Sequence, residues 1–258
     1  MREFFGFGGY QREPEGFFSW QHIVFVTSLV LIMIGMAIWL GLKNRNKDEK
    51  TKNKVLIISA ILIDSIELFK IILLCFREQN PLHWIYDLPL FLCSIQLITI
   101  PFAAFSKGRL REAALDFVMI FGILGALAGT YGAGNIYGSH PVLSFDSVVS
   151  GITHCISGFV SLYIMIANLI SMKKENIWIL FTILLSFLVV AYVVNVIIDY
   201  NYMFLMRGDG TPYDIFYNLV NGNKVLYPMI VLLLFCLYIF LFYFAYFKIA
   251  SKVKKQAA

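Results

Sequence analysis

The sequence predicts an all-helical, polytopic membrane protein, and its composition and the lengths of its apolar runs lead to that prediction. Of the 258 residues, 59% are hydrophobic and 14% are charged, against roughly 25% charged residues in an ordinary soluble domain. A soluble chain of this length needs a polar surface around its core, and the sequence has too few charges to provide one. The composition therefore excludes a soluble enzyme, a nucleic-acid-binding protein and a disordered chain.

Seven apolar runs are long enough, at about 20 residues each, to cross a hydrocarbon core as helices. We predict membrane spans at Ile23–Leu42, Val55–Phe76, Trp84–Phe105, Ala113–Tyr131, Ser147–Ile170, Ile177–Tyr200 and Val225–Phe247. The first 22 residues are polar and glycine-rich, and they do not have the pattern of a signal peptide. The prediction is a single domain over residues 1–258, formed by a bundle of seven transmembrane helices.

The distribution of Lys and Arg between the connecting segments predicts the orientation of the bundle. One side carries fifteen of the 21 basic residues, in the first, third and fifth connections and the C-terminal tail, and the other side carries five. Because positive charge is retained in the cytoplasm, we expect the N-terminus outside and the C-terminus inside. The net charge of +5 then reflects topology and attraction to anionic lipid, and it does not indicate nucleic acid.

Charged residues in the second span are the first candidates for a functional site, because lipid penalises charge. Asp64, Glu67 and Lys70 are spaced by three, so neighbours lie on adjacent faces of one helix. Glu67 and Lys70 can form an ion pair, which lowers the cost of burying both charges. The pair fits two interpretations equally well, a structural contact or the polar wall of a substrate cavity.

The fifth span carries a seam of small polar residues with a histidine in its middle. Close helix packing explains the serines but not His154, which lies about 12 Å from the external end of the span. In the third span Cys93 lies at nearly the same depth, about 13 Å, which favours a Cys–His pair. The seam consists of Ser147, Ser150, His154, Ser157 and Ser161.

Two further spans carry polar or small residues at helical spacing. In the sixth span, Asn195 and Asp199 are four residues apart, and we expect them on one helix face near the external side. In the fourth span, the Gly125–Gly129 spacing forms a G-x-x-x-G motif, which predicts close helix packing. The cysteines show no C-x-x-C spacing and no disulfide pattern, so we expect neither a metal nor a cofactor. They are Cys75, Cys93, Cys155 and Cys236.

Five short motifs, taken in order, resemble those of the YwaF-type bacterial integral membrane proteins, relatives of the eukaryotic transmembrane-protein-164 acyltransferases. The resemblance extends from about Phe18 to the seventh span. At one position the chain departs from the pattern, because many YwaF-type members have His or Gln where this chain has Phe91. The motifs are Phe18-Ser-Trp-Gln-His22, Glu67 with Lys70, Leu88-Pro-Leu-Phe-Leu-Cys93, His154, and Asn201-Tyr-Met-Phe-Leu205.

The resemblance implies a seven-helix acyltransferase of the cell membrane that moves fatty acyl chains between membrane phospholipids. It places the nucleophile at Cys93 and its base at His154. We expect Asn195 or Gln96 to donate to the oxyanion that forms during the reaction. The alternative is a transporter or small-molecule receptor that uses the same polar cavity. A retinal protein is excluded, because the last span, 225–247, contains no lysine.

Overall fold

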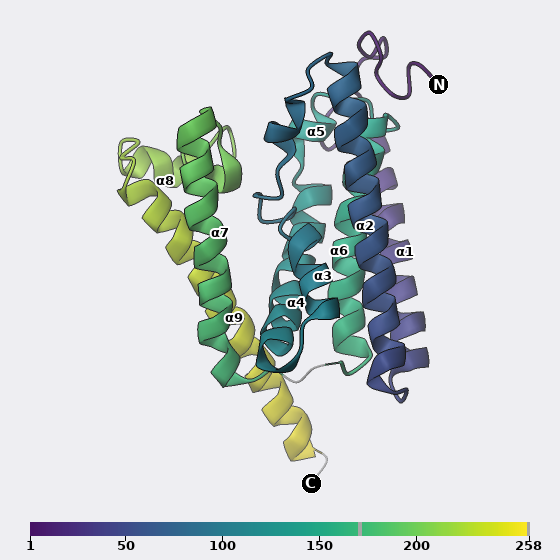
Figure 1. Ribbon diagram of the computed structural model, residues 1–258, viewed down its shortest axis with the longest axis vertical. Coiled ribbons are helices and arrows are strands. Elements are labelled where there is room, and N and C mark those ends of the chain that lie inside the picture. Colours follow the sequence, from purple (N-terminus) through teal and green to yellow (C-terminus); the bar gives the residue numbers. More distant parts are fainter. Residues whose placement is uncertain (170–171, 257–258) are drawn as a thin grey trace. The chain divides into compact units, whose positions relative to one another are not determined.

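The computed structural model describes residues 1–169 and 172–256 of the chain, and every regular element in these two ranges is helical (Figure 1). The chain divides into two compact units, Met1–Ser171 and Met172–Ala258. Ile170, the predicted end of the fifth span, lies outside the described residues.

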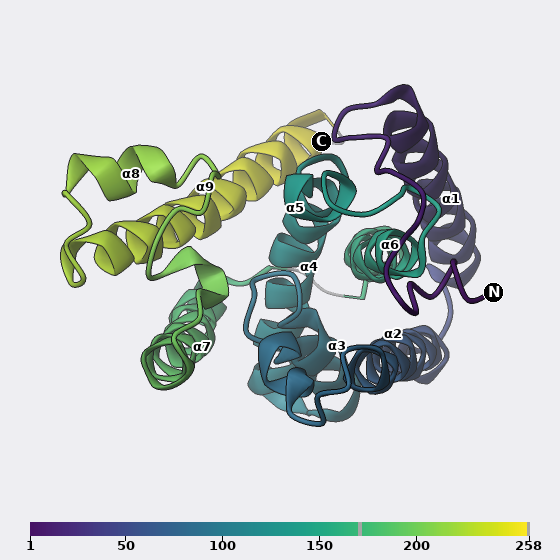
Figure 2. The same ribbon diagram turned by 90° about the horizontal axis from the view of Figure 1, so that it is seen from above.

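The first unit is built around α6, which packs against α1, α2 and α4. Figure 2 shows α6 nearly end-on, with these helices around it. Ser19 caps the start of α1 and Ser144 that of α6, each hydroxyl accepting a backbone N–H three residues later. The elements of the unit are α1 (Trp20–Asn44), α2 (Glu49–Arg77), the 3₁₀ helix η1 (His83–Asp87), α3 (Gln96–Phe105), α4 (Gly108–Tyr131), α5 (Gly134–Tyr137) and α6 (Phe145–Ile166).

The contact between α4 and α6 is the most extensive in this unit, and small residues make it close. A Cβ atom added at Gly122 of α4 would lie 2.7 Å from the carbonyl oxygen of Ser157 in α6. The Ser161 hydroxyl donates across the interface to the carbonyl of Met119. The serines at the C-terminal end of the seam therefore serve helix packing, as the sequence suggested.

The third predicted span is not a continuous helix, which corrects the prediction for Trp84–Phe105. Helix α3 covers only Gln96–Phe105, and the chain before it runs through η1 and an irregular segment, 88–95. Proline has no N–H to donate and disfavours a helical conformation in the residue before it, so Pro89 explains the interruption. The irregular segment carries Cys93, which is therefore not on a helix.

The second unit contains two long helices, and α9 contacts both α7 and the short helix α8. Helix α7 ends at Ile198, and Asp199 follows it in a left-handed conformation with φ of 51° and an exposed side chain. Asp199 therefore does not continue the helix face of Asn195, contrary to the prediction. The elements are η2 (Lys174–Asn176), α7 (Ile177–Ile198), η3 (Tyr202–Phe204), α8 (Asp214–Leu219) and α9 (Leu226–Gln256).

Five helical segments in the described ranges are long and apolar enough to cross a membrane. Helix α2 has 29 residues but carries the charges of Asp64, Glu67 and Lys70. Many large apolar side chains on the long helices are exposed, as expected of surfaces that face lipid. The chain is a multi-pass helical membrane protein. The five segments are Trp20–Asn44, Gly108–Tyr137, Phe145–Ile166, Lys174–Ile198 and Leu226–Ile249.

The segment before α1 is anchored to the ends of α2 and α6. The guanidinium of Arg77 donates to both carboxylate oxygens of Asp146, at 2.6 and 3.2 Å, and to the carbonyl of Phe5 at 3.3 Å. The Tyr10 hydroxyl also donates to Asp146. Burial and this carboxylate raise the pKa of Tyr10 to about 12. The phenol thus stays protonated at neutral pH and holds the segment in place.

His22, which belongs to the first of the five motifs, has a structural role in this unit. Its side chain is fully buried, and its Nε2 donates to the carbonyl of Thr130 in α4 at 3.0 Å. Its Nδ1 accepts from the backbone N–H of Phe18 at 3.2 Å. The imidazole thereby joins the start of α1 to the end of α4, one residue beyond Gly129.

Candidate functional site

The structure brings Cys93 and His154 together, although they are 61 positions apart in the sequence. Cys93 lies on the irregular segment before α3, and His154 lies in the middle of α6. The two side chains form a hydrogen bond. Both residues are partly buried. The predicted proximity of Cys93 and His154 is therefore found, although Cys93 does not lie on the helix from which its depth was counted.

A short turn presents the Cys93 thiol. The Ser94 hydroxyl accepts from the backbone N–H of Phe91 at 3.0 Å and donates to its carbonyl at 3.1 Å. The backbone N–H of Ser94 donates to the Cys93 sulfur. Helix α3 begins three residues later, and the positive end of a helix dipole stabilises a nearby anion. The turn therefore offers electrostatic support to a thiolate at Cys93.

The tautomer of His154 follows from its second contact. Its Nδ1 lies 2.6 Å from the backbone carbonyl oxygen of Ser150, one helical turn earlier. A carbonyl oxygen only accepts hydrogen bonds, so Nδ1 must carry the proton. The neutral ring then has its lone pair on Nε2, where it can accept the thiol proton of Cys93. The carbonyl of Ser150 thus fixes the orientation of the imidazole, with Nε2 toward Cys93.

Two glycines of α4 leave room for the Cys–His pair. A Cβ added at Gly129 would lie 1.8 Å from Cδ2 and 2.1 Å from Nε2 of His154, far inside van der Waals contact. A Cβ added at Gly125 would lie 3.6 Å from the Cα and Cβ atoms of Cys93. The G-x-x-x-G motif therefore packs against both members of the pair. From the sequence we interpreted it as a helix-packing motif only.

A charged cluster lies beside the pair. Lys70 of α2 forms an ion pair with Glu67 and a second one with Asp87 at 3.2 Å, and all three side chains are at most about one-fifth exposed. His83 approaches Asp87 at 3.6 Å. Glu67 is near enough to His154 to act on it electrostatically. The predicted Glu67–Lys70 pair forms, and its network includes Asp87.

Gln96, three residues after Cys93 in the sequence, has an unused donor among the described residues. Its side chain is fully buried at the start of α3, and its Oε1 accepts from the Thr99 hydroxyl at 3.0 Å. Its Nε2 has no hydrogen-bond partner among the described residues. A buried donor without a partner is costly and unusual in a native protein, and it is common where a substrate supplies the acceptor. Gln96 therefore suits the oxyanion role that the sequence suggested for it.

The amides of Asn195 and Asn201 are used within the second unit. Asn195 donates to the carbonyl of Tyr202 at 3.0 Å and accepts from its N–H at 2.7 Å. Asn201 donates to the carbonyl of Arg207 at 2.8 Å and accepts from the N–H of Met206 at 2.9 Å. Both residues are buried. They hold the chain reversal after α7, whereas Gln96 Nε2 has no hydrogen-bond partner among the described residues.

Sequence reasoning missed three contributions to the site. Asp87 opens the third predicted span but was not chosen, because nothing in the sequence shows that it folds back onto Lys70. Ser150 contacts His154 through its backbone carbonyl. Every residue has such a carbonyl, so the residue type at position 150 gives no indication of this contact. Gly129 had a signal in its motif, but the motif does not show which side chain occupies the space. The contributions of Asp87 and Gly129 depend on contacts between separate segments, and that of Ser150 is a backbone contact within α6.

The fold and the site together define a multi-pass helical membrane protein with a cysteine–histidine pair partly buried among its helices. Among the described residues, no group of His, Cys, Asp and Glu side chains is arranged to hold a metal ion, and all four cysteines are free. Residues 17–246 match the model of the TMEM164 family, so the chain belongs to that family. No curated protein and no solved structure matches the chain.

Proposed function

We propose that the protein is an acyltransferase that moves fatty acyl chains between membrane phospholipids through a thioester on Cys93. One observation carries the proposal. His154 donates from Nδ1 to the carbonyl of Ser150, which leaves Nε2 free to take the thiol proton. The cell membrane provides the substrates, and the motifs favour the YwaF-type branch of the family.

The topology that accompanies this proposal is a single domain with seven spans, with the N-terminus outside and the C-terminus in the cytoplasm. The excess of basic residues in the connections that would then be cytoplasmic supports this orientation. In this topology His154 lies in the half of the membrane nearer the outer surface, about 12 Å along α6, and Cys93 contacts it there. Phospholipids of the outer leaflet can reach the pair from the side.

In the first half-reaction His154 Nε2 takes the proton of the Cys93 thiol, and the sulfur attacks the carbonyl carbon of a phospholipid ester. A C–S bond forms, and the carbonyl oxygen becomes an oxyanion. When the C–O bond of the ester breaks, His154 returns the proton to the oxygen of the leaving lysophospholipid. The acyl chain remains on Cys93 as a thioester.

In the second half-reaction His154 deprotonates the hydroxyl of an acceptor lysophospholipid. The resulting oxygen nucleophile attacks the thioester carbonyl, the C–S bond breaks, and the proton returns to Cys93. Dividing the transfer in this way replaces one difficult step by two easier ones. Gln96 Nε2 supplies a donor for the oxyanion in both halves, and one such donor contributes about 3 kcal/mol.

Acyl transfer in vesicles tests the proposal. Purified protein is reconstituted with a phospholipid carrying a labelled acyl chain and an unlabelled lysophospholipid, and labelled product is measured by mass spectrometry. Cys93→Ser should abolish most transfer. His154→Ala should reduce it by about 100-fold or more, as expected for a general base. Cys236→Ser, which changes another partly buried cysteine, is the matched control and should transfer at the wild-type rate.

The same vesicles distinguish the competing class of function. If Cys93→Ala transfers acyl chains at the wild-type rate, the mechanism is wrong and Cys93 is a buried apolar side chain. If the wild-type protein transfers no acyl chains but labelled solutes cross the vesicle membrane, the protein is a transporter that uses the same polar cluster.

A further inference from the structure

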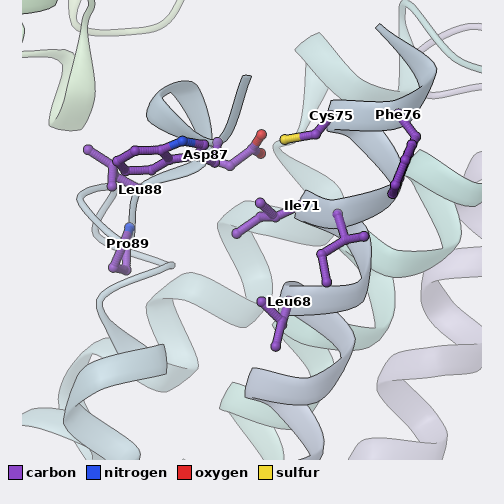
Figure 3. Close-up of a pocket in the computed structure, with 9 residues that line it drawn as sticks. Leu68, Ile71, Cys75, Phe76, Asp87, Leu88 and Pro89 are labelled. Carbon is purple, nitrogen blue, oxygen red and sulfur yellow. The ribbon is translucent and has the colours of Figure 1, made fainter. Parts of the chain in front are cut away.

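A recess of about 440 Å³ lies between α2 and the segment that contains η1 (Figure 3). This volume falls within the range of roughly 300–1,000 Å³ that is typical of ligand pockets. Figure 3 shows Ile71 and Asp87 on opposite sides of the space, with Cys75 beside it. The recess is lined by Leu68, Ile71, Ile72, Cys75, Phe76, Trp84, Asp87, Leu88 and Pro89.

The shape and chemistry of the recess suit an extended hydrocarbon chain. The five residues that α2 contributes recur at positions i, i+3, i+4, i+7 and i+8, so they form one helix face about 12 Å long. All but one of the lining residues are apolar or a cysteine. Leu68 is 59% exposed and Phe76 is 74% exposed. On a membrane helix such side chains face hydrocarbon, so the recess opens sideways to the lipid.

Asp87 gives this apolar recess one charged edge. Its carboxylate lines the space and also pairs with Lys70 at 3.2 Å. A molecule bound along the recess would therefore have an apolar body against α2 and a polar end near the Lys70–Asp87 pair. A phospholipid has this division between a hydrocarbon chain and a polar part. A compact polar solute would find only one polar side chain in the recess.

The two walls of the recess are the elements that build the candidate site. Leu68 follows Glu67, which acts electrostatically on His154. Pro89 begins the irregular segment that carries Cys93 four residues later. A chain held in the recess therefore lies against the two segments that place the polar cluster and the thiol.

We propose that this recess binds one acyl chain of a phospholipid, with the polar part of the lipid at the Lys70–Asp87 pair. The proposal rests on the proposed function in one respect, because acyl transfer is the reason why a chain would be held there. It goes beyond that function by naming where the substrate chain is held. The charged pair orients the lipid, and the apolar face of α2 fixes the position of its chain.

Photo-crosslinking tests the recess without requiring turnover. The Cys93→Ser variant is placed in phosphatidylcholine vesicles that contain a phosphatidylcholine with a diazirine midway along one acyl chain. After illumination, crosslinked peptides are identified by mass spectrometry. We expect crosslinks at Leu68, Ile72 and Trp84 in excess over other lipid-facing positions of α2. Adding Ile72→Trp should fill the recess and lower this yield by about tenfold, the smaller end of what a pocket loses when a group no longer fits.

The matched control is Ile61→Trp, which places the same side chain three turns away on nearly the same face of α2. Ile61 is 60% exposed and does not line the recess. This variant should leave the crosslinks unchanged. Trp84→Ala, which removes a large side chain from the wall of the recess, should also lower the yield at Leu68 and Ile72.

The outcomes separate the recess from the proposed chemistry. Two results would contradict the proposal that the recess binds an acyl chain: crosslinks spread evenly along the exposed faces of the helices, or an equal loss with Ile72→Trp and Ile61→Trp. Acyl transfer by the wild-type protein would be unaffected by either result. Crosslinks concentrated in the recess support it, including when the wild-type protein forms no thioester. In that case the recess holds a lipid chain and the proposed function is wrong.

Discussion

The buried polar groups around Cys93 and those around Asn195 use their hydrogen-bonding capacity differently. In the second unit, the amides of Asn195 and Asn201 both donate and accept within a few residues of the chain. In the first unit, His154 uses Nδ1 on a backbone carbonyl and offers Nε2 to the thiol. Gln96 leaves its Nε2 without a partner among the described residues.

The difference indicates which buried polar groups act on a substrate and which support the fold. Amides that are bonded to the nearby backbone, as those of Asn195 and Asn201 are, stabilise one conformation of the chain. A buried donor without a partner costs free energy that only a bound acceptor recovers. This difference supports the proposal that Cys93, His154 and Gln96 act on the substrate, while Asn195 and Asn201 support the fold.

The largest effect is expected from the charged cluster beside the Cys–His pair. Lys70 lies between Glu67 and Asp87, so Lys70→Met leaves two carboxylates close together without a cation. This change should cost about 3 kcal/mol of stability, as expected for breaking a buried ion pair. Glu67→Gln should cost less, because Lys70 keeps its contact with Asp87. Thermal unfolding of the purified variants measures both changes.

The double variant Glu67→Gln with Lys70→Met completes the cycle. If Glu67 and Lys70 interact, the loss in the double variant is smaller than the sum of the two single losses. Additive losses would show that the two side chains do not interact, and the charged cluster would then offer no support to the site.

A slightly smaller effect, on the rate of acyl transfer, is expected at Gly129, which packs against the imidazole of His154. Gly129→Ala places a methyl group on the imidazole of His154. The ring must move from its position beside Cys93, and a displacement of about 1 Å can cost about 100-fold in rate. Gly35→Ala is the matched control, since a Cβ at Gly35 in α1 has no atom within 4 Å. If both variants transfer acyl chains equally well, Gly129 does not position His154.

The smallest effect is expected in the second unit, at Asn195. Asn195→Ala removes both contacts to the backbone of Tyr202 and should cost about 1–2 kcal/mol of stability. The rate of acyl transfer per folded molecule should stay unchanged, because the amide acts only within the second unit. Unfolding and transfer are measured on the same preparation. A loss of transfer at unchanged stability would return Asn195 to the oxyanion role that the sequence first suggested.

The sequence predicted those parts of the fold and the site that depend on position along a helix. The apolar runs matched helices except at Trp84–Phe105, where Pro89 interrupts the helix. Counting residues gives a depth for His154, because α6 is a continuous helix, but not for Cys93, because residues 88–95 are irregular. The spacing of three residues was enough to predict the ion pair between Glu67 and Lys70, because both residues lie on one helix.

The contacts that the sequence did not predict join segments that are distant in the chain. Asp87 reaches Lys70 because the chain turns back after α2, and a single sequence contains no record of that approach. Helical periodicity placed Asp199 on the face of Asn195, but the helix ends one residue earlier in a left-handed turn. The G-x-x-x-G motif indicated that Gly129 is a packing residue, but the sequence does not show that it packs against the ring of His154.

Mass spectrometry of the acylated protein tests the central claim most directly. The wild-type protein is incubated with a phospholipid in vesicles, quenched in acid and digested, and every cysteine peptide is examined for the mass of an acyl chain. We predict an acyl group on Cys93 that hydroxylamine removes, and no such group in His154→Ala. Acyl transfer by the wild-type protein with Cys93 unmodified, or a thioester on another cysteine, would contradict the assignment of Cys93 and His154.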